Sequence, residues 1–186
     1  MNKQFPDRKR IRLKDYDYLK PGYYFVTINR NKKINDLSSI KNGDIKLGET
    51  GKIVDKVWND LPNHYPNCEL DAYVIMPNHV HGIIKLINRT EGFVILPKKG
   101  FTTLPDKNEK TNKINHGLPE IIRGFKTFSS KTINEKIKPQ QKFRWQKSYH
   151  DRIIRNEHEL NNVRKYIVNN PLNWGNDQNN PGDIDL

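Results

Sequence analysis

Two histidines separated by one residue, His79-Val80-His81, form the pattern in this chain that points most directly to chemistry. On a β-strand, residues i and i+2 point to the same face of the sheet, so both imidazoles would project together while Val80 faces the other way. Neutral imidazole is a common ligand for divalent metal ions. Two ligands alone do not make a metal site, and a pair on a solvated strand face that binds nothing is the simpler alternative.

A second pair of functional groups lies near the C-terminus, where Tyr166 and Asn170 are four residues apart. On an α-helix this spacing places both side chains on one face. A tyrosine phenol can act as a nucleophile, and an asparagine carbonyl oxygen can bind a hard cation. Taken alone, Tyr166 is equally explained as a core residue of an amphipathic helix, and Asn170 as a normal helix end before Pro171.

Strand and helix signals alternate along the chain and predict the elements that position these residues. Runs rich in β-branched and aromatic residues predict the strands, which are 23–29, 69–75, 79–86 and 143–154. Apolar residues at helical spacing predict the helices, which are 49–62, 118–135 and a last one between an N-cap at Asn156 and Pro171. This order predicts an α+β fold, a ferredoxin-like βαββαβ antiparallel sheet with helices on one face plus an extra C-terminal helix that carries Tyr166.

The length of 186 residues favours one domain. We expect residues 1–175 to form it, with residues 1–20 as a basic N-terminal arm and residues 176–186 as a tail. Residues 88–116 lose all periodicity and are rich in Lys, Asn, Thr, Gly and Pro, which indicates a long flexible insertion with room for a short strand at 93–96.

The formal charge of +12, from 33 Lys and Arg against 21 Asp and Glu, favours a polyanionic partner such as DNA or RNA. A basic surface that only keeps the protein soluble is the alternative, but here the charge is clustered. One cluster, at 8–14, contains Arg8, Lys9, Arg10 and Arg12, and a second, at 123–147, contains Arg123, Lys126 and Lys131. The second cluster is interleaved with aromatic residues, some of which must belong to the core while the others would stack on exposed bases. They are Phe125, Phe128, Phe143, Trp145 and Tyr149.

The composition also excludes several classes of protein. The single cysteine, Cys68, excludes an intramolecular disulfide framework and a cysteine-based zinc cluster. No apolar run approaches the roughly 18–20 residues of a transmembrane helix. The N-terminal residues lack the apolar stretch of a secretory signal. We therefore expect a cytoplasmic protein that does not contact membranes.

The combination of MPNHVHG at 76–82 with YIVNNPLNW at 166–174 resembles the single-tyrosine HUH transposases, insertion-sequence enzymes that act on single-stranded DNA. Further segments resemble the branch of REP-associated tyrosine transposases. They are RKRIRLKDYDY at 8–18, GYYFVTIN at 22–29, GKIVDKVW at 51–58, LDAYVIMPNHVHGII at 70–84, IIRGFKTFSSK at 121–131 and WQKSYHDRIIRNEHEL at 145–160. The resemblance covers nearly the whole chain except the 88–116 segment and the tail.

This resemblance implies roles for individual residues. His79 and His81 match the metal-ligand histidines of the family, Tyr166 matches the nucleophile, and Asn170 matches the polar group that completes a site for Mg²⁺ or Mn²⁺. The implied reaction is metal-assisted cleavage and rejoining of single-stranded DNA through a covalent 5′-phosphotyrosine. Tyr149 is a rival nucleophile by residue type, but it lacks a polar partner four residues on and is interpreted as a substrate-side or packing residue.

The resemblance also implies the partner. We expect hairpin-containing single-stranded DNA from repetitive palindromic elements, bound by a monomer or a homodimer, with activity at the bacterial nucleoid. The four N-terminal basic residues named above would contact phosphates, and Arg123, Lys126 and Lys131 would line the DNA groove; each is equally explained as a solvated charge. His64 and His150 are left outside the metal shell.

Two other functions stay open. One is a non-catalytic nucleic-acid-binding protein on the same fold, although the aromatic-rich Gly-Phe-Gly-Phe strand typical of such RNA binders is absent. The other is a metallonuclease in which water attacks the phosphodiester. That enzyme would form no covalent intermediate and would not depend on Tyr166.

Overall fold

A four-stranded antiparallel sheet lies at the centre of the computed structural model, which describes residues 13, 16–31, 34, 36–89, 115–137, 140–177 and 180. The strands are ordered β4 (Cys68–Ile75), β5 (His79–Leu86), β1 (Gly22–Asn29) and β6 (His150–Ile154). The first and third strands of the βαββαβ unit are therefore central, and all three strand pairs are antiparallel. The predicted ferredoxin-like fold class is confirmed.

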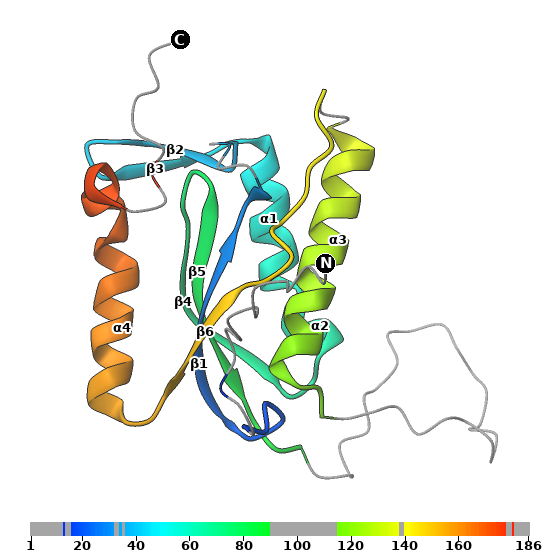
Figure 1. Cartoon of the computed structure of the whole chain (residues 1–186), viewed down its shortest axis with the longest axis vertical. Coiled ribbons are helices and arrows are strands. Elements are labelled where there is room, and N and C mark those ends of the chain that lie inside the picture. Colours follow the sequence, from blue (N-terminus) through cyan, green and yellow to red (C-terminus); the bar gives the residue numbers. More distant parts are fainter. Residues whose placement is uncertain are drawn as a thin grey trace, which may run out of the picture.

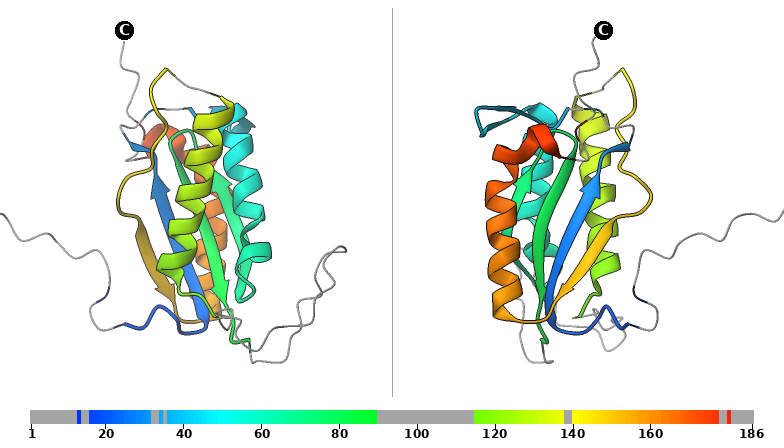
Figure 2. Two further views of the ribbon diagram at one scale, coloured as in Figure 1. Left: turned by 90° about the vertical axis from the view of Figure 1, so that its right-hand side faces the viewer. Right: turned by 60° about the vertical axis from the view of Figure 1, so that its left-hand side comes forward.

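The sheet separates two layers of helices (Figures 1 and 2). Helices α1 (Glu49–Asn59) and α3 (Leu118–Lys136) cover one face, and α4 (Glu157–Asn169) covers the other. Each face has its own apolar core. Under α1 and α3, Trp58 packs edge to face on Phe125 with ring centroids 5.2 Å apart. Under α4, Leu160, Val163 and Ile167 form the buried face of the helix.

Strand β5 alternates between the two cores and so determines where its histidines point. Val80 and Ile84 belong to the core under α1 and α3, whereas Ile83 belongs to the core under α4. His79 and His81 alternate with Val80 and therefore share the face of Ile83. The prediction that both imidazoles project together, away from Val80, is confirmed.

Two predicted elements have different limits in the structure. The helix expected at 49–62 ends at Asn59, and a short helix, α2 (Leu61–His64), follows with Pro62 in its first turn. Proline is accepted there because the first N–H groups of a helix have no partner within it. The strand expected at 143–154 begins only at His150. Before it, the side chain of Asn134 bonds both the N–H and the carbonyl of Phe143, and Trp145 makes only an isolated bridge to residue 30.

A hairpin of two short strands, β2 (Ser38–Lys41) and β3 (Asp44–Leu47), lies outside every predicted element. Its turn is Asn42-Gly43, and both residues adopt positive φ, 53° and 84°. An Asn-Gly pair is the usual sequence of such a turn, so this dipeptide was the sign in the sequence from which the hairpin could have been predicted. A Cβ on Gly43 would run into the side chain of Leu172, so the hairpin turn packs against the 3-10 helix η2 (Asn170–Asn176) that follows α4.

Some expectations fall on residues that the structure does not describe. They are the strand at 93–96, most of the 88–116 segment and the N-terminal residues Arg8, Lys9, Arg10 and Arg12. Among the helices of the described part of the chain, none has both the length and the apolar character that crossing a membrane requires.

The close approach of α1 to the preceding segment explains a glycine inside this helix. Helix propensity alone would favour alanine at Gly51 by about 1 kcal/mol. A Cβ there would, however, overlap the backbone carbonyl oxygen of Leu37, which has no rotamer by which to move away. We expect Gly51→Ala to lower the free energy of unfolding in urea by about 1–3 kcal/mol.

Gly175→Ala is the matched control, because its Cβ would meet no atom. It should change stability by less than about 0.5 kcal/mol. A Gly51→Ala protein at least as stable as wild type would show that α1 does not rest on Leu37.

Candidate active site

His79 and His81 lie side by side, buried between the sheet and α4, with their Nε2 atoms 2.9 Å apart. The other nitrogen of each ring is held by a neighbour. His79 Nδ1 is 2.9 Å from Oδ1 of Asn78, and His81 Nδ1 is 2.9 Å from Oγ1 of Thr27. An amide oxygen can only accept, so His79 carries its hydrogen on Nδ1 and presents a lone pair at Nε2.

Burial keeps both imidazoles uncharged at neutral pH. Loss of hydration lowers the pKa of His79 to about 4 and that of His81 to about 3, with the neighbouring His79 lowering the latter further. Both rings therefore offer lone pairs rather than positive charges. Neutral imidazole is the form that binds a metal ion.

The donor atoms at this point fit a divalent cation. Metal–nitrogen bonds of about 2.0–2.1 Å place adjacent ligands of one ion about 3 Å apart, close to the observed separation of the two Nε2 atoms. Oδ2 of Asp177 lies 3.9 Å from His79 Nε2. Ligand atoms of His79, His81 and Asp177 all lie within 4.8 Å of one another. Asn170 is buried, and its Oδ1 has no hydrogen-bond partner among the described residues. Carboxylate and amide oxygens are ligands that hard cations such as Mg²⁺ prefer.

Tyr166 reaches this pair from α4. Its phenolic oxygen is 3.4 Å from His81 Nε2, and its ring packs edge-on against Phe25. The side chain is 49 % exposed, so a substrate can reach it. Partial burial raises the pKa of the phenol, a hydrogen bond from Asn170 lowers it, and the Asp177 carboxylate raises it again. The structure thus brings together His79, His81, Tyr166 and Asn170, as the sequence analysis expected.

Side-chain contacts hold α4 in place. The N-cap predicted at Asn156 is confirmed, since its Oδ1 accepts from the N–H of Glu159 at 2.8 Å. Arg164, two residues before Tyr166, donates two hydrogen bonds to the Asp71 carboxylate, at 2.9 and 2.6 Å, and holds the pKa of that carboxyl below its usual value. Asp71 lies where the register of β4 shifts against β5, so the helix turn that carries the phenol is tied to an irregular part of the sheet.

Asp177 is the site residue that sequence reasoning missed. The chain turns after α4 into η2 and folds back, so that the Trp174 ring lies 6.1 Å from the His79 ring and Asp177 follows at the end of the helix. No spacing rule connects an aspartate in a polar tail with histidines almost a hundred positions earlier. The Asn170-Pro171 step, where a helix normally ends, was the only local sign of a change in direction.

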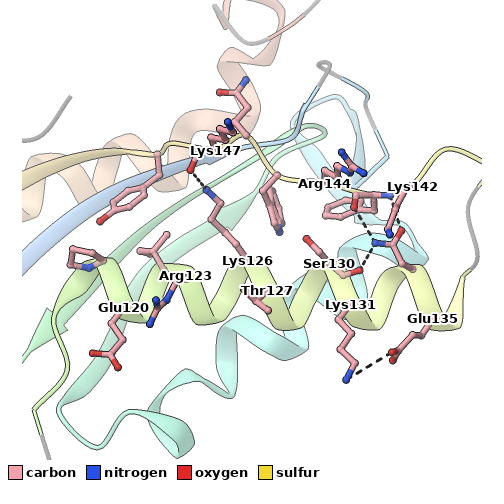
Figure 3. Close-up of a pocket in the computed structure, with 17 residues that line it drawn as sticks. Glu120, Arg123, Lys126, Thr127, Ser130, Lys131, Glu135, Lys142, Arg144 and Lys147 are labelled. Atoms are coloured by element: carbon pink, nitrogen blue, oxygen red, sulfur yellow. Dashed lines mark hydrogen bonds and ion pairs between the residues drawn. The ribbon is translucent and has the colours of Figure 1, made fainter. Parts of the chain in front are cut away.

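A hollow that we call the basic groove lies on the opposite face of the sheet, between α3 and residues 142–149 (Figure 3). Its volume is about 1230 Å³. Its basic residues are Arg123, Lys126, Lys131, Lys142, Arg144 and Lys147. All three residues predicted on this helix therefore line one groove. Arg123 and Lys131 are exposed, and Lys131 pairs with Glu135 of the same groove at 4.0 Å. The Lys126 ammonium donates to the carbonyls of residues 147 and 148, at 3.0 and 3.2 Å, and so links the two walls.

The prediction that aromatic residues of this region stack on bases is wrong for most of them. Phe125, Phe143, Trp145 and Tyr149 are buried in the core under α1 and α3, which confirms Tyr149 as a packing residue. Phe128 is exposed, and its ring lies parallel to that of His64 at 6.0 Å. The basic groove therefore presents positive charge rather than a stacking surface.

Known proteins resemble this chain in sequence and in fold. Residues 111–170 match the family described as "Transposase IS200 like", a segment that contains Tyr166 and ends at Asn170. An uncharacterized protein of Haemophilus influenzae is 35 % identical over 172 residues, which cover 92 % of each chain. A solved structure of a REP-associated tyrosine transposase bound to a REP hairpin has a TM-score of 0.53, covers 86 % of this chain and 72 % of that one, and is 19 % identical. At that identity the likeness shows the fold.

The buried neutral histidines make stability depend on pH. An unfolded histidine titrates near pH 6.5, well above the folded pKa values of about 4 and about 3. Below that pH the unfolded state binds more protons, so acid favours unfolding. We expect the free energy of unfolding to be highest above about pH 7, where the histidines are neutral in both states. It should fall by up to about 2 kcal/mol per histidine by about pH 5.

Urea denaturation in EDTA at these two pH values measures the loss. His81→Asn removes one of the two titrations, so this variant should lose less stability than wild type over the same interval. An equal loss in both proteins would contradict burial of a neutral ring at this position.

Proposed function

The chain belongs to the IS200-like transposase family, and on that basis we propose that it cleaves and rejoins hairpin-containing single-stranded DNA through a covalent bond to Tyr166. The observation that supports this most directly is the approach of the phenolic oxygen to His81 Nε2, at 3.4 Å. A half-exposed nucleophile thus stands beside two neutral ligand side chains. The buried tyrosine Tyr149 has no comparable surroundings.

The proposed step exchanges one phosphate ester for another. Oη of Tyr166 forms a bond to phosphorus, and the bond from phosphorus to the 3′-oxygen breaks. The phenolic proton passes to solvent, and the departing 3′-oxygen takes up a proton. The products are a 5′-phosphotyrosine and a free 3′-hydroxyl. Because the bond broken and the bond formed are of the same kind, attack by another 3′-hydroxyl reverses the step and joins strands.

We propose that Mg²⁺ or Mn²⁺ is held by His79, His81 and Asn170, the set that the family resemblance implies, and we add Asp177 to it. When bound, the cation would polarise the scissile phosphate and offset its charge. The protein's part is to keep both Nε2 lone pairs available. The Asn78 oxygen does this for His79, because it can only accept from Nδ1. The Thr27 hydroxyl would accept from Nδ1 of His81 when a cation occupies Nε2.

The basic groove is proposed to bind DNA outside the scissile site. Its occupant would be the backbone of the hairpin region, since Arg123 and Lys131 supply exposed charge while the neighbouring aromatic residues are buried. The REP-associated tyrosine transposase that shares this fold is bound to a REP hairpin in its solved structure. We extend that substrate class to this chain, acting as a monomer or a homodimer, with the N-terminal Arg8, Lys9, Arg10 and Arg12 as further phosphate contacts.

Replacing the nucleophile tests the covalent mechanism. Labelled hairpin DNA with single-stranded flanks, incubated with Mn²⁺, should give a protein–DNA adduct on a denaturing gel. Tyr166→Phe removes only the attacking oxygen, so the adduct should disappear. Cleavage should fall by about 10² or more, as expected when a nucleophile is removed. Tyr149→Phe removes a buried hydroxyl and should keep the adduct.

Two results would redirect this proposal. Cleavage without an adduct, unchanged in Tyr166→Phe, would indicate the metallonuclease in which water attacks. Binding without cleavage on many hairpins would indicate a non-catalytic DNA-binding protein.

Removing the carboxylate tests the extended ligand set. A Mg²⁺ site usually contains at least one carboxylate, because a hard cation is held poorly by neutral donors alone. We therefore expect Asp177→Asn to weaken Mn²⁺ binding roughly tenfold or more, measured by titration calorimetry or by the electron paramagnetic resonance of free Mn²⁺.

Asp60→Asn is the matched control, since Asp60 also contacts a histidine, His64, but on the exposed surface of α2. It should leave Mn²⁺ affinity unchanged. Loss of binding in His81→Gln together with full binding in Asp177→Asn would keep the histidine site and remove Asp177 from it.

A further inference from the structure

Helix α3, which lines the basic groove, and α4, which carries Tyr166, lie on opposite faces of the sheet (Figure 2). A DNA molecule that occupies both must therefore cross an edge of the sheet. The edge strands are β4 and β6, and the wall of the groove at 142–149 continues directly into β6. The shortest route from the groove to the phenol thus passes over β6. This reasoning rests on the proposed function.

Alternation along β6 decides which side chains meet the crossing strand. Tyr149 and Ile153 belong to the core under α1 and α3. Arg152, between them, points to the other face, where it pairs with Glu159 of α4 at 2.6 Å. His150 has the parity of Arg152 and therefore lies on the face of the active site. Arg152 is 68 % exposed although it pairs with Glu159, so its guanidinium remains open to solvent at this edge.

The register of the sheet places His150 in one row with the active site. His150 pairs with Thr27 on β1, and Thr27 pairs with His81 on β5. Thr27 is also the residue that holds His81 Nδ1, at 2.9 Å. Adjacent strands are about 4.8 Å apart, so the backbones of His150 and His81 are separated by about 10 Å. Among the described residues His150 is exposed, with no hydrogen bond or ion pair assigned to its ring.

We propose that His150 donates a ring N–H to a phosphate oxygen of the DNA strand as this strand passes from the basic groove to Tyr166. A backbone contact fits better than a base contact, because the exposed neighbours are the cations Lys147 and Arg152 and β6 carries no aromatic residue. The imidazole has an N–H in either protonation state. His150 is thus a substrate-contacting residue that sets which phosphate arrives at the phenol.

Neutralising one phosphate at a time tests this contact. Binding is measured in the Tyr166→Phe protein, which leaves the DNA uncut, on hairpin DNA whose single-stranded flank carries a single methylphosphonate at successive positions. At one position close to the cleavage point, the loss of charge should weaken binding roughly tenfold, the usual size of a charge-assisted hydrogen bond. With His150→Ala added, the same methylphosphonate should have almost no effect.

Two further variants make the result specific. His158→Ala removes another exposed histidine, near the start of α4, and should keep the full tenfold response. His150→Gln keeps an N–H donor and should keep part of it. Equal responses with and without His150 would overturn its role while leaving the proposed function in place. Failure of every variant to bind hairpin DNA would overturn both.

Discussion

The burial of two uncharged imidazole rings between the sheet and α4 is the constraint on which the rest of this structure depends. Such rings need a partner on each far nitrogen and exclusion of water around them, or their burial would not be tolerated. Thr27 and Asn78 meet the first need, and α4 with its apolar face meets the second. Strand β5, its central neighbour β1 and the last helix together meet this requirement.

A single sheet serves two separate tasks because its faces are independent. The face under α4 is polar at one end, where the histidines lie, and apolar at the other. The face under α1 and α3 is mostly apolar and borders the basic groove. The two histidines and Tyr166 therefore lie on the opposite side of the sheet from the basic groove.

The sequence was most informative where the physical rule is local. Alternation in β5, helical spacing in α3 and the cap at Asn156 depend on neighbours in the chain, so the fold class was predictable. The meeting of His81 with Tyr166 was expected from the family resemblance, because spacing alone left it open. Features that depend on distant partners were not. Asn134 removes Phe143 from the sheet, and η2 carries Asp177 back to His79. Aromatic residues between lysines looked like a stacking surface, and only the packing shows that most of them form the core.

The manner in which α4 is attached has a mechanical consequence. The histidines belong to a strand that is hydrogen-bonded to neighbours on both sides, whereas α4 is held by apolar contacts and by the ion pairs Arg164–Asp71 and Arg152–Glu159. Tyr166 and the two histidines therefore lie on elements that are anchored in different ways. Separation of α4 breaks no strand ladder, so the phenol can change its position on a faster timescale than the sheet unfolds. Under the proposed mechanism, in which one DNA end leaves and another is accepted, Tyr166 would move with α4 while the sheet that holds His79 and His81 stays folded.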